Sequence, residues 1–262
     1  MKKERLVNFA LTTGSYSTFL DTIIDLAKNK SSAMICVANV HMYIEAQRDN
    51  QFLQVINSAE MVTPDGKPLT WALRFLYGIR QDRVAGMDIL PDLLRLMALN
   101  NISAYFYGSS PSILEKTQLY LKNFYPDFSV VGLHSPPFYS STEMNETITD
   151  EQVITTINMS RPSVVFVVLG CPKQERWMSS MKNRINTVMI GVGGALPVLI
   201  GIQKRAPRWM QNYGLEWFFR LMQEPGRLFK RYVSTNRLFI WIIFKEFVKI
   251  KLLIPLGLSK IS

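Results

Sequence analysis

Five short turns, each following an apolar run, hold the residues of this sequence best suited to chemistry. They are Asn39, Thr63–Gly66, Gly108–Ser110, Gly170–Glu175 and Gly191–Gly194. None matches a Walker loop or the pattern G-x-G-x-x-G, and a glycine in such a turn commonly serves backbone geometry alone. If the fold brings all five to one rim, however, they indicate a phosphate-bearing ligand, because helix N-termini present free N–H groups to anions.

Three side chains in or near these turns have distinct chemical abilities. The carboxylate of Asp65 can act as a general base, although aspartate before glycine is also an ordinary turn element. The amide of Asn39 can donate and accept hydrogen bonds, as sugar or base recognition requires, or it can cap the end of a strand. The planar guanidinium of Arg83 can hold two phosphate oxygens, or it can form a surface ion pair with Asp82 or Asp88.

A metal centre built from histidine and cysteine is not expected. The chain has only two of each, His41, His134, Cys36 and Cys171, and a zinc site would need nearly all of them from distant places. Both cysteines lie in apolar runs, which favours reduced thiols in the core over a disulfide framework.

The apolar runs before these turns predict the elements that position them. Continuous runs rich in Val, Ile and aromatic residues are typical of strands buried on both faces, hence of a parallel sheet. They are Ala33–Val40, Ile102–Tyr107, Phe128–Leu133, Ser163–Leu169 and Thr187–Val192. Amphipathic stretches that predict helices alternate with them, at Phe19–Lys28, Ile89–Leu99 and Pro111–Phe124. This alternation predicts a Rossmann-like α/β fold, a parallel sheet sandwiched by helices, whose ligands bind beyond the carboxyl ends of the strands.

The last quarter of the chain differs in composition, so we divide it into an α/β domain, residues 1–201, and a helical appendage, residues 202–262. The appendage holds 12 Lys and Arg against three Asp and Glu, which accounts for nearly all of the net charge of +10. Its basic residues alternate with aromatic and aliphatic ones, as in helices that lie on an anionic membrane surface. We expect Phe239, Trp241 and Phe244 to reach the acyl boundary there. An ordinary packed helix pair is the alternative.

The sequence favours neither a nucleic-acid partner nor export or insertion into a membrane. Runs such as LFIWIIF, Leu238–Phe244, are too apolar for a groove that binds nucleic acid. No apolar stretch has the length of a signal peptide or a membrane span, so we expect the active part to face the cytosol.

Five sequence blocks give the chain a recognisable resemblance. They are TPDGKPL at Thr63–Leu69, RVAGMDILPDLL at Arg83–Leu94, VVLGCPKQERWM at Val167–Met178, GVGGAL at Gly191–Leu196 and RAPRWMQNYGLEWFFRLMQEPGRLFKRY at Arg205–Tyr232. With them the chain resembles the WecG/TagA/CpsF family, glycosyltransferase family 26. The resemblance implies inverting, metal-independent transfer of a sugar from a UDP-sugar to a polyprenyl-diphosphate-linked sugar. It further implies a peripheral enzyme on the cytoplasmic face of the plasma membrane, active in cell-surface polysaccharide or teichoic acid assembly.

The resemblance and the chemistry of inverting transfer together suggest roles for particular residues. Asp65 is the expected base and Arg83 the expected partner of the leaving diphosphate. Arg227 and Arg231, four residues apart on one helical face, are expected to grip the acceptor's diphosphate, with lipid headgroup binding as the alternative. Expected substrate-binding residues in the turns are Asn39, Gly66, Gly108, Gln174, Gly193 and Gly194.

One position departs from the family pattern. Where the family often has Gly-Gly-Ala-Phe-Asp, this chain has Leu196 and Pro197 after Ala195, so no role is transferred to an acid there. The donor sugar stays open among N-acetylmannosamine, its uronic acid and glucose, and a homo-oligomer is possible.

Two readings compete with a transferase. One is a non-enzymatic scaffold at the membrane surface that organises an assembly complex. The other is a nucleotide-dependent oxidoreductase, which is disfavoured because the chain lacks the glycine fingerprint and the acid about 20 residues after it.

Overall fold

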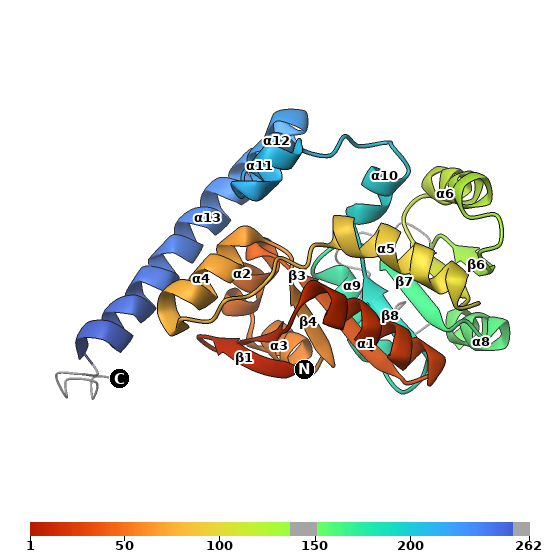
Figure 1. The fold of residues 1–262 in the computed structure, drawn as a ribbon, viewed down its shortest axis with the longest axis horizontal. Coiled ribbons are helices and arrows are strands. Elements are labelled where there is room, and N and C mark those ends of the chain that lie inside the picture. Colours follow the sequence, from red (N-terminus) through yellow and green to blue (C-terminus); the bar gives the residue numbers. More distant parts are fainter. Residues whose placement is uncertain (137–150, 254–262) are drawn as a thin grey trace.

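The computed structural model describes residues 1–136 and 151–253, and it is built on a six-stranded parallel sheet (Figure 1). The strand order is β4-β3-β8-β7-β5-β6. The strands are β3 (Ala33–Ala38), β4 (Met61–Pro64), β5 (Ala104–Gly108), β6 (Val130–His134), β7 (Val164–Val168) and β8 (Val188–Gly191). The predicted α/β class is therefore confirmed, and each of the five predicted strands is present within a few residues of its expected bounds.

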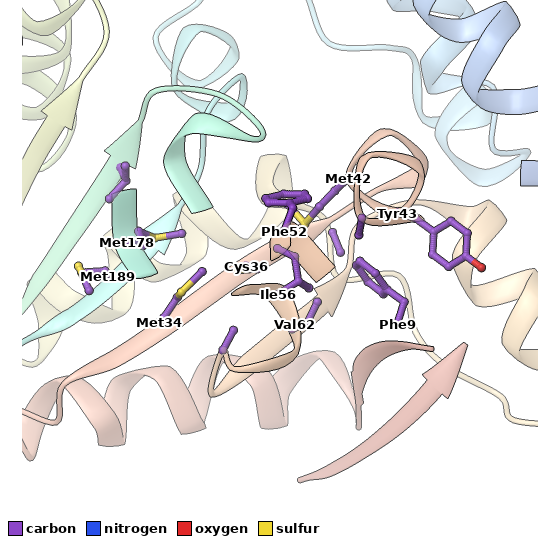
Figure 2. Packing of buried hydrophobic residues seen from close by; sticks show 14 of the residues in the cluster. Phe9, Met34, Cys36, Met42, Tyr43, Phe52, Ile56, Val62, Met178 and Met189 are labelled. Carbon is purple, nitrogen blue, oxygen red and sulfur yellow. The ribbon is translucent and has the colours of Figure 1, made fainter. Parts of the chain in front are cut away.

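Helices cover both faces of this sheet, because successive side chains of a strand point to opposite faces. In β3, Met34 and Cys36 face one hydrophobic cluster, while Ile35 and Val37 face the other. Figure 2 shows the first cluster. The helices that contribute buried residues to it are α2 (Val40–Arg48), α3 (Asn50–Asn57), α4 (Lys67–Tyr77), α8 (Glu151–Ser160), α9 (Lys173–Met181) and α13 (Pro225–Val248). The second cluster takes residues from α1 (Tyr16–Lys28), α5 (Gly86–Leu99), α6 (Pro111–Phe124) and α10 (Ala195–Leu199).

An antiparallel hairpin, which was not predicted from the sequence, precedes the α/β unit. Its strands are β1 (Lys2–Leu6) and β2 (Phe9–Thr13). Strand β1 is mostly exposed, with only Leu6 buried, whereas four of the five residues of β2 are buried. The polar sequence of β1 thus gives little of the apolar signal by which the other strands were predicted.

The C-terminal stretch forms helices that pack on the rest of the molecule. They are α11 (Arg208–Asn212), α12 (Glu216–Gln223), α13 (Pro225–Val248) and a π-helical turn, Lys249–Leu253. Helix α13 lies along α2 and α4 (blue, Figure 1). The rings of Tyr43 and Phe239 meet edge to face at 5.3 Å, and those of Phe75 and Phe247 stack at 4.6 Å. Within the described ranges, no helix is both long and apolar enough to cross a membrane.

The expected lipid-facing residues fall into two groups. Phe239 is only 7% exposed and belongs to the first core cluster, so its assignment to the lipid boundary was wrong. The amphipathic pattern marked an apolar face correctly, but that face packs on α2. Trp241 and Phe244 are exposed, and their contact with a membrane stays a prediction, as does the division into two domains.

Replacement of Phe239 by alanine should destabilise the protein by about 3 kcal/mol, because it empties a buried aromatic site between α13 and α2. Urea unfolding followed by circular dichroism measures this loss. The matched control is Phe229→Ala on the exposed side of the same helix, where a change within about 0.5 kcal/mol is expected. Equal losses for both variants would contradict the packing of α13 described above.

Candidate active site

A cleft of about 1070 Å³ lies beyond the carboxyl ends of β3, β4, β7 and β8. The turns after these strands form one wall, and residues of α11, α12 and α13 form the opposite wall. The predicted site residues that line it are Asn39, Asp65, Gly66, Arg83, Gln174, Gly193, Gly194, Arg227 and Arg231. Gly108 is not among the lining residues, whereas its neighbour Ser109 is. The convergence expected of the turns is thus present in the fold.

Asp65 follows β4 directly and is fixed by its backbone, whose N–H donates to the carbonyl of Ala38 at 2.7 Å. Its side chain opens onto the cleft, and no residue of the described ranges hydrogen-bonds its carboxylate. Burial raises the pKa of Asp65 to about 7, with Glu216 adding to the rise and Arg83 and Arg220 opposing it. A carboxylate whose pKa lies near neutrality is suited to accept a proton at physiological pH.

Arg83 is held by two carboxylates from different parts of the chain. Its Nη1 donates to Oε2 of Glu216 at 2.6 Å, and its Nη2 donates to Oδ2 of Asp88 at 2.7 Å. Asp88 also pairs with Arg205. The ion pair foreseen as an alternative is therefore formed, with Asp88 and not with Asp82, and Arg83 joins the α/β unit to α12. Its contact with a diphosphate stays a prediction.

The two predicted amide side chains already make structural hydrogen bonds. Oδ1 of Asn39 accepts from the N–H of Met42 at 3.1 Å, so Asn39 caps the start of helix α2 and not, as the alternative had it, the end of a strand. Oε1 of Gln174 accepts from the N–H of Gly170, and its Nε2 donates to Oε1 of Glu175 at 2.7 Å. Gln174 is 5% exposed. It therefore shapes the β7–α9 turn, and a contact with the donor stays a prediction.

The glycine turns bring backbone close to other groups. Gly108 has φ of 109°, and a Cβ there would lie 2.7 Å from the carbonyl carbon of Val168, so glycine is required by geometry. Gly66 begins α4 as its N-cap. Gly193 has φ of 41°, and a Cβ on Gly194 would lie 3.2 Å from Nη2 of Arg220. The guanidinium of Arg220 thus lies against the Gly193-Gly194 turn.

Arg220 and Glu216 were not among the residues predicted for this site. The two are four residues apart, hence on one face of α12, and this spacing was the available signal. Only the packing of α12 over the strand ends shows that this face is the one turned to the cleft.

The arginines of α13 differ in their surroundings. Arg227 is exposed and pairs with Glu224 at 2.5 Å. Arg231 lies over the ring of Tyr232, and its Nε is buried with no hydrogen-bond partner in the described part of the chain. Burial lowers the pKa of His41, and the charge of Arg231 lowers it further, which places this arginine beside the α2 wall of the cleft.

Comparison with known proteins gives this cleft its context. The chain matches the model of the Glycosyl transferase WecG/TagA/CpsF family over residues 4–252. It belongs to this family. A relative from Bacillus subtilis (strain 168) is 27% identical over 251 residues, which cover 94% of this chain and 93% of the relative. A relative from Staphylococcus aureus (strain MW2) is 28% identical over 225 residues, 86% of this chain and 84% of the relative. Both are named N-acetylglucosaminyldiphosphoundecaprenol N-acetyl-beta-D-mannosaminyltransferase.

The chain is accordingly a glycosyltransferase, as its sequence blocks predicted, and the cleft is its candidate active site. One end of the cleft is apolar. Trp71 and Phe75 of α4 and Ile240 and Phe244 of α13 line it and are all exposed. The glycosyltransferase therefore offers charged groups at the strand ends and an apolar surface between α4 and α13.

Among residues 1–136 and 151–253, no three His, Cys, Asp or Glu side chains are grouped so that they could hold a metal ion. Cys36 and Cys171 are free thiols, as predicted, and burial raises the pKa of each well above its usual value. Metal-independent transfer stays a prediction for this glycosyltransferase.

Proposed function

We propose that this glycosyltransferase moves an N-acetylmannosamine-type sugar from a UDP-sugar to a polyprenyl-diphosphate-linked sugar, with inversion at the anomeric carbon. The uronic acid of that sugar and glucose are the alternative donors. The observation that carries the proposal is the cleft itself, where a carboxylate with a pKa of about 7 shares one site with Arg83, Arg220 and Arg231. The names of the relatives supply the sugar and the lipid-linked acceptor.

The proposed reaction assigns one task to each side of the cleft. Asp65 takes the proton of the acceptor hydroxyl while that oxygen forms a bond to the anomeric carbon of the donor. The bond from the anomeric carbon to the diphosphate breaks at the same time, and UDP leaves with its added negative charge. Arg220, against the Gly193-Gly194 turn, stabilises that charge, and Arg83 adds positive charge to the site while its acidic partners hold it in place.

The apolar end of the cleft supports a lipid-linked acceptor. The exposed side chains of Trp71, Phe75, Ile240 and Phe244 continue directly from the charged part of the site. With the basic residues of α13, they fit a peripheral position on an anionic membrane, in which Arg227 and Arg231 meet the acceptor's diphosphate or lipid headgroups. We place the enzyme on the cytoplasmic face of the plasma membrane, where UDP-sugars are available.

A donor screen tests this function. Purified protein is given a panel of UDP-sugars with a short-chain lipid-diphosphate sugar, and products are identified by mass spectrometry. The expected product carries one added N-acetylhexosamine, and UDP, unlike NAD, should raise the melting temperature. Stabilisation by NAD would favour an oxidoreductase. No transfer from any donor, with no effect of UDP, would favour the scaffold.

Transfer should persist in excess EDTA, because four arginines line the cleft and bring positive charge to the leaving diphosphate. Turnover is measured with and without the chelator on the same soluble acceptor. A loss of turnover in EDTA that Mg²⁺ or Mn²⁺ restores would contradict the metal-independent mechanism.

A further inference from the structure

Glu216 is an acid within the cleft to which the proposed reaction assigns no task. It is the first residue of α12, and its side chain is 20% exposed. One carboxylate oxygen, Oε2, accepts from Arg83 at 2.6 Å. The other, Oε1, is buried and has no hydrogen-bond partner within the described ranges. Burial of a half-satisfied carboxylate costs free energy, so its position in a catalytic cleft calls for a compensating role.

Arg83 is the residue through which Glu216 can act. Glu216 holds Nη1 of Arg83, while Asp88 and, at 3.4 Å, Gln211 hold Nη2. Both ends of the guanidinium are therefore occupied by groups other than Asp65. Asp65 lines the same cleft and feels the positive charge of Arg83. Without Glu216, Nη1 would lose its acidic partner, and Asp65 would be a nearby carboxylate free to replace it.

We propose that Glu216 is a positioning residue of the transfer reaction, which holds Arg83 away from Asp65 and so keeps Asp65 available as the base. This inference rests on the proposed function, since it takes Asp65 as the group that accepts the acceptor's proton. Glu216 itself touches neither the acceptor hydroxyl nor the anomeric carbon in this mechanism.

The charges around Asp65 give the direction of the effect. Burial is the main cause of its raised pKa, and the negative charge of Glu216 is the next. Arg83 and Arg220 lower the pKa, and Asp88 raises it slightly, being itself paired with Arg205. Without the charge of Glu216, Asp88 would be the acid that opposes the effect of Arg83 and Arg220 on the pKa of Asp65, and Asp88 is itself paired with Arg205. The pKa of Asp65 would then fall, and its carboxylate would become a weaker base.

The test is the pH dependence of kcat in Glu216→Gln, which keeps the size of the side chain and a hydrogen bond to Arg83. The midpoint of the acidic limb should move down by on the order of one pH unit, as expected for a neighbouring charge. The plateau at high pH should fall by roughly three-fold, because the rate of general-base catalysis falls less than proportionally with the strength of the base. Glu216→Asp retains the charge and should keep the wild-type midpoint. Glu246→Gln, an equal change of charge outside the cleft, should match wild type throughout.

A titration without substrate provides an independent readout. Carboxyl ¹³C NMR of aspartate-labelled protein, with Asp65 assigned by its absence in Asp65→Asn, should show a lower midpoint in Glu216→Gln than in wild type. Wild-type transfer combined with an unchanged midpoint in Glu216→Gln would overturn the inference and leave the proposed function standing. Loss of activity to the same extent in Glu216→Gln and Glu216→Asp, at unchanged midpoints, would reduce Glu216 to a structural contact. Failure of the wild type to transfer any sugar would overturn both.

Discussion

Replacing Asp65 by asparagine should lower kcat by ~10²–10⁴-fold while UDP binding stays near that of wild type. The amide has nearly the same shape as the carboxylate but cannot accept the proton of the acceptor hydroxyl. The nucleotide does not need that proton transfer, so its affinity should be preserved. Turnover on a soluble acceptor, together with calorimetric binding of UDP, measures both quantities.

The pH dependence of the wild type belongs to the same prediction. Because burial raises the pKa of Asp65 to about 7, activity should rise as the pH increases through that value and the carboxylate forms. Asp82→Asn is the matched control, since Asp82 lies outside the cleft and its carboxylate accepts from the backbone N–H of Tyr16. If Asp65→Asn keeps more than about a tenth of wild-type turnover, with an unchanged melting curve, Asp65 is not the base.

Arg220→Ala should lower kcat by about 10²–10³-fold, the usual cost of removing one group that stabilises developing negative charge. Arg220 lies against the Gly193-Gly194 turn, and no ion pair with an acid of the described ranges neutralises it. Its effect should persist on a soluble acceptor, where attachment to a membrane is irrelevant. Steady-state kinetics with that acceptor measures the loss.

The matched control for Arg220 is Arg208→Ala, which removes the same charge from an exposed position outside the cleft. Normal turnover of Arg220→Ala on the soluble acceptor, with a deficit only on vesicles, would make this arginine an anchor. Arg231→Ala tests the same two alternatives, catalysis or membrane attachment, for α13. The guanidinium of Arg231 lies beside the α2 wall and not on the outer surface.

The parts of the structure that follow from local sequence were predictable. Strands buried on both faces carry unbroken apolar runs, as in Val164–Val168, and parallel strands bring their carboxyl ends to one edge. That rule alone placed Asn39, Asp65 and Gln174 around one cleft. The hairpin strand β1 was missed because most of its side chains face solvent, so no apolar pattern marks it.

The opposite wall of the cleft depends on packing between distant segments, which no local pattern contains. The spacing of Glu216 and Arg220 predicts a shared helical face but not the surface that this face meets. The same limit explains the wrong prediction for Phe239. The apolar face of α13 was assigned to lipid because the sequence does not show whether such a face contacts a membrane or packs on another helix such as α2. For a related reason the sequence did not identify Glu216 as a partner of Arg83, because the two residues are 133 positions apart along the chain.

The position of α12 and α13 in the chain has a consequence for synthesis. Ribosomes release a protein from its N-terminus, and domains begin to fold as they emerge. The strand that completes the sheet ends at Gly191, whereas the second wall of the cleft, with Glu216 and Arg220, follows it. A nascent chain can therefore assemble the base and its turns before it has the groups that tune the base and receive the leaving diphosphate. Catalytic competence should arise only when the last helices dock, so that incomplete chains remain inert.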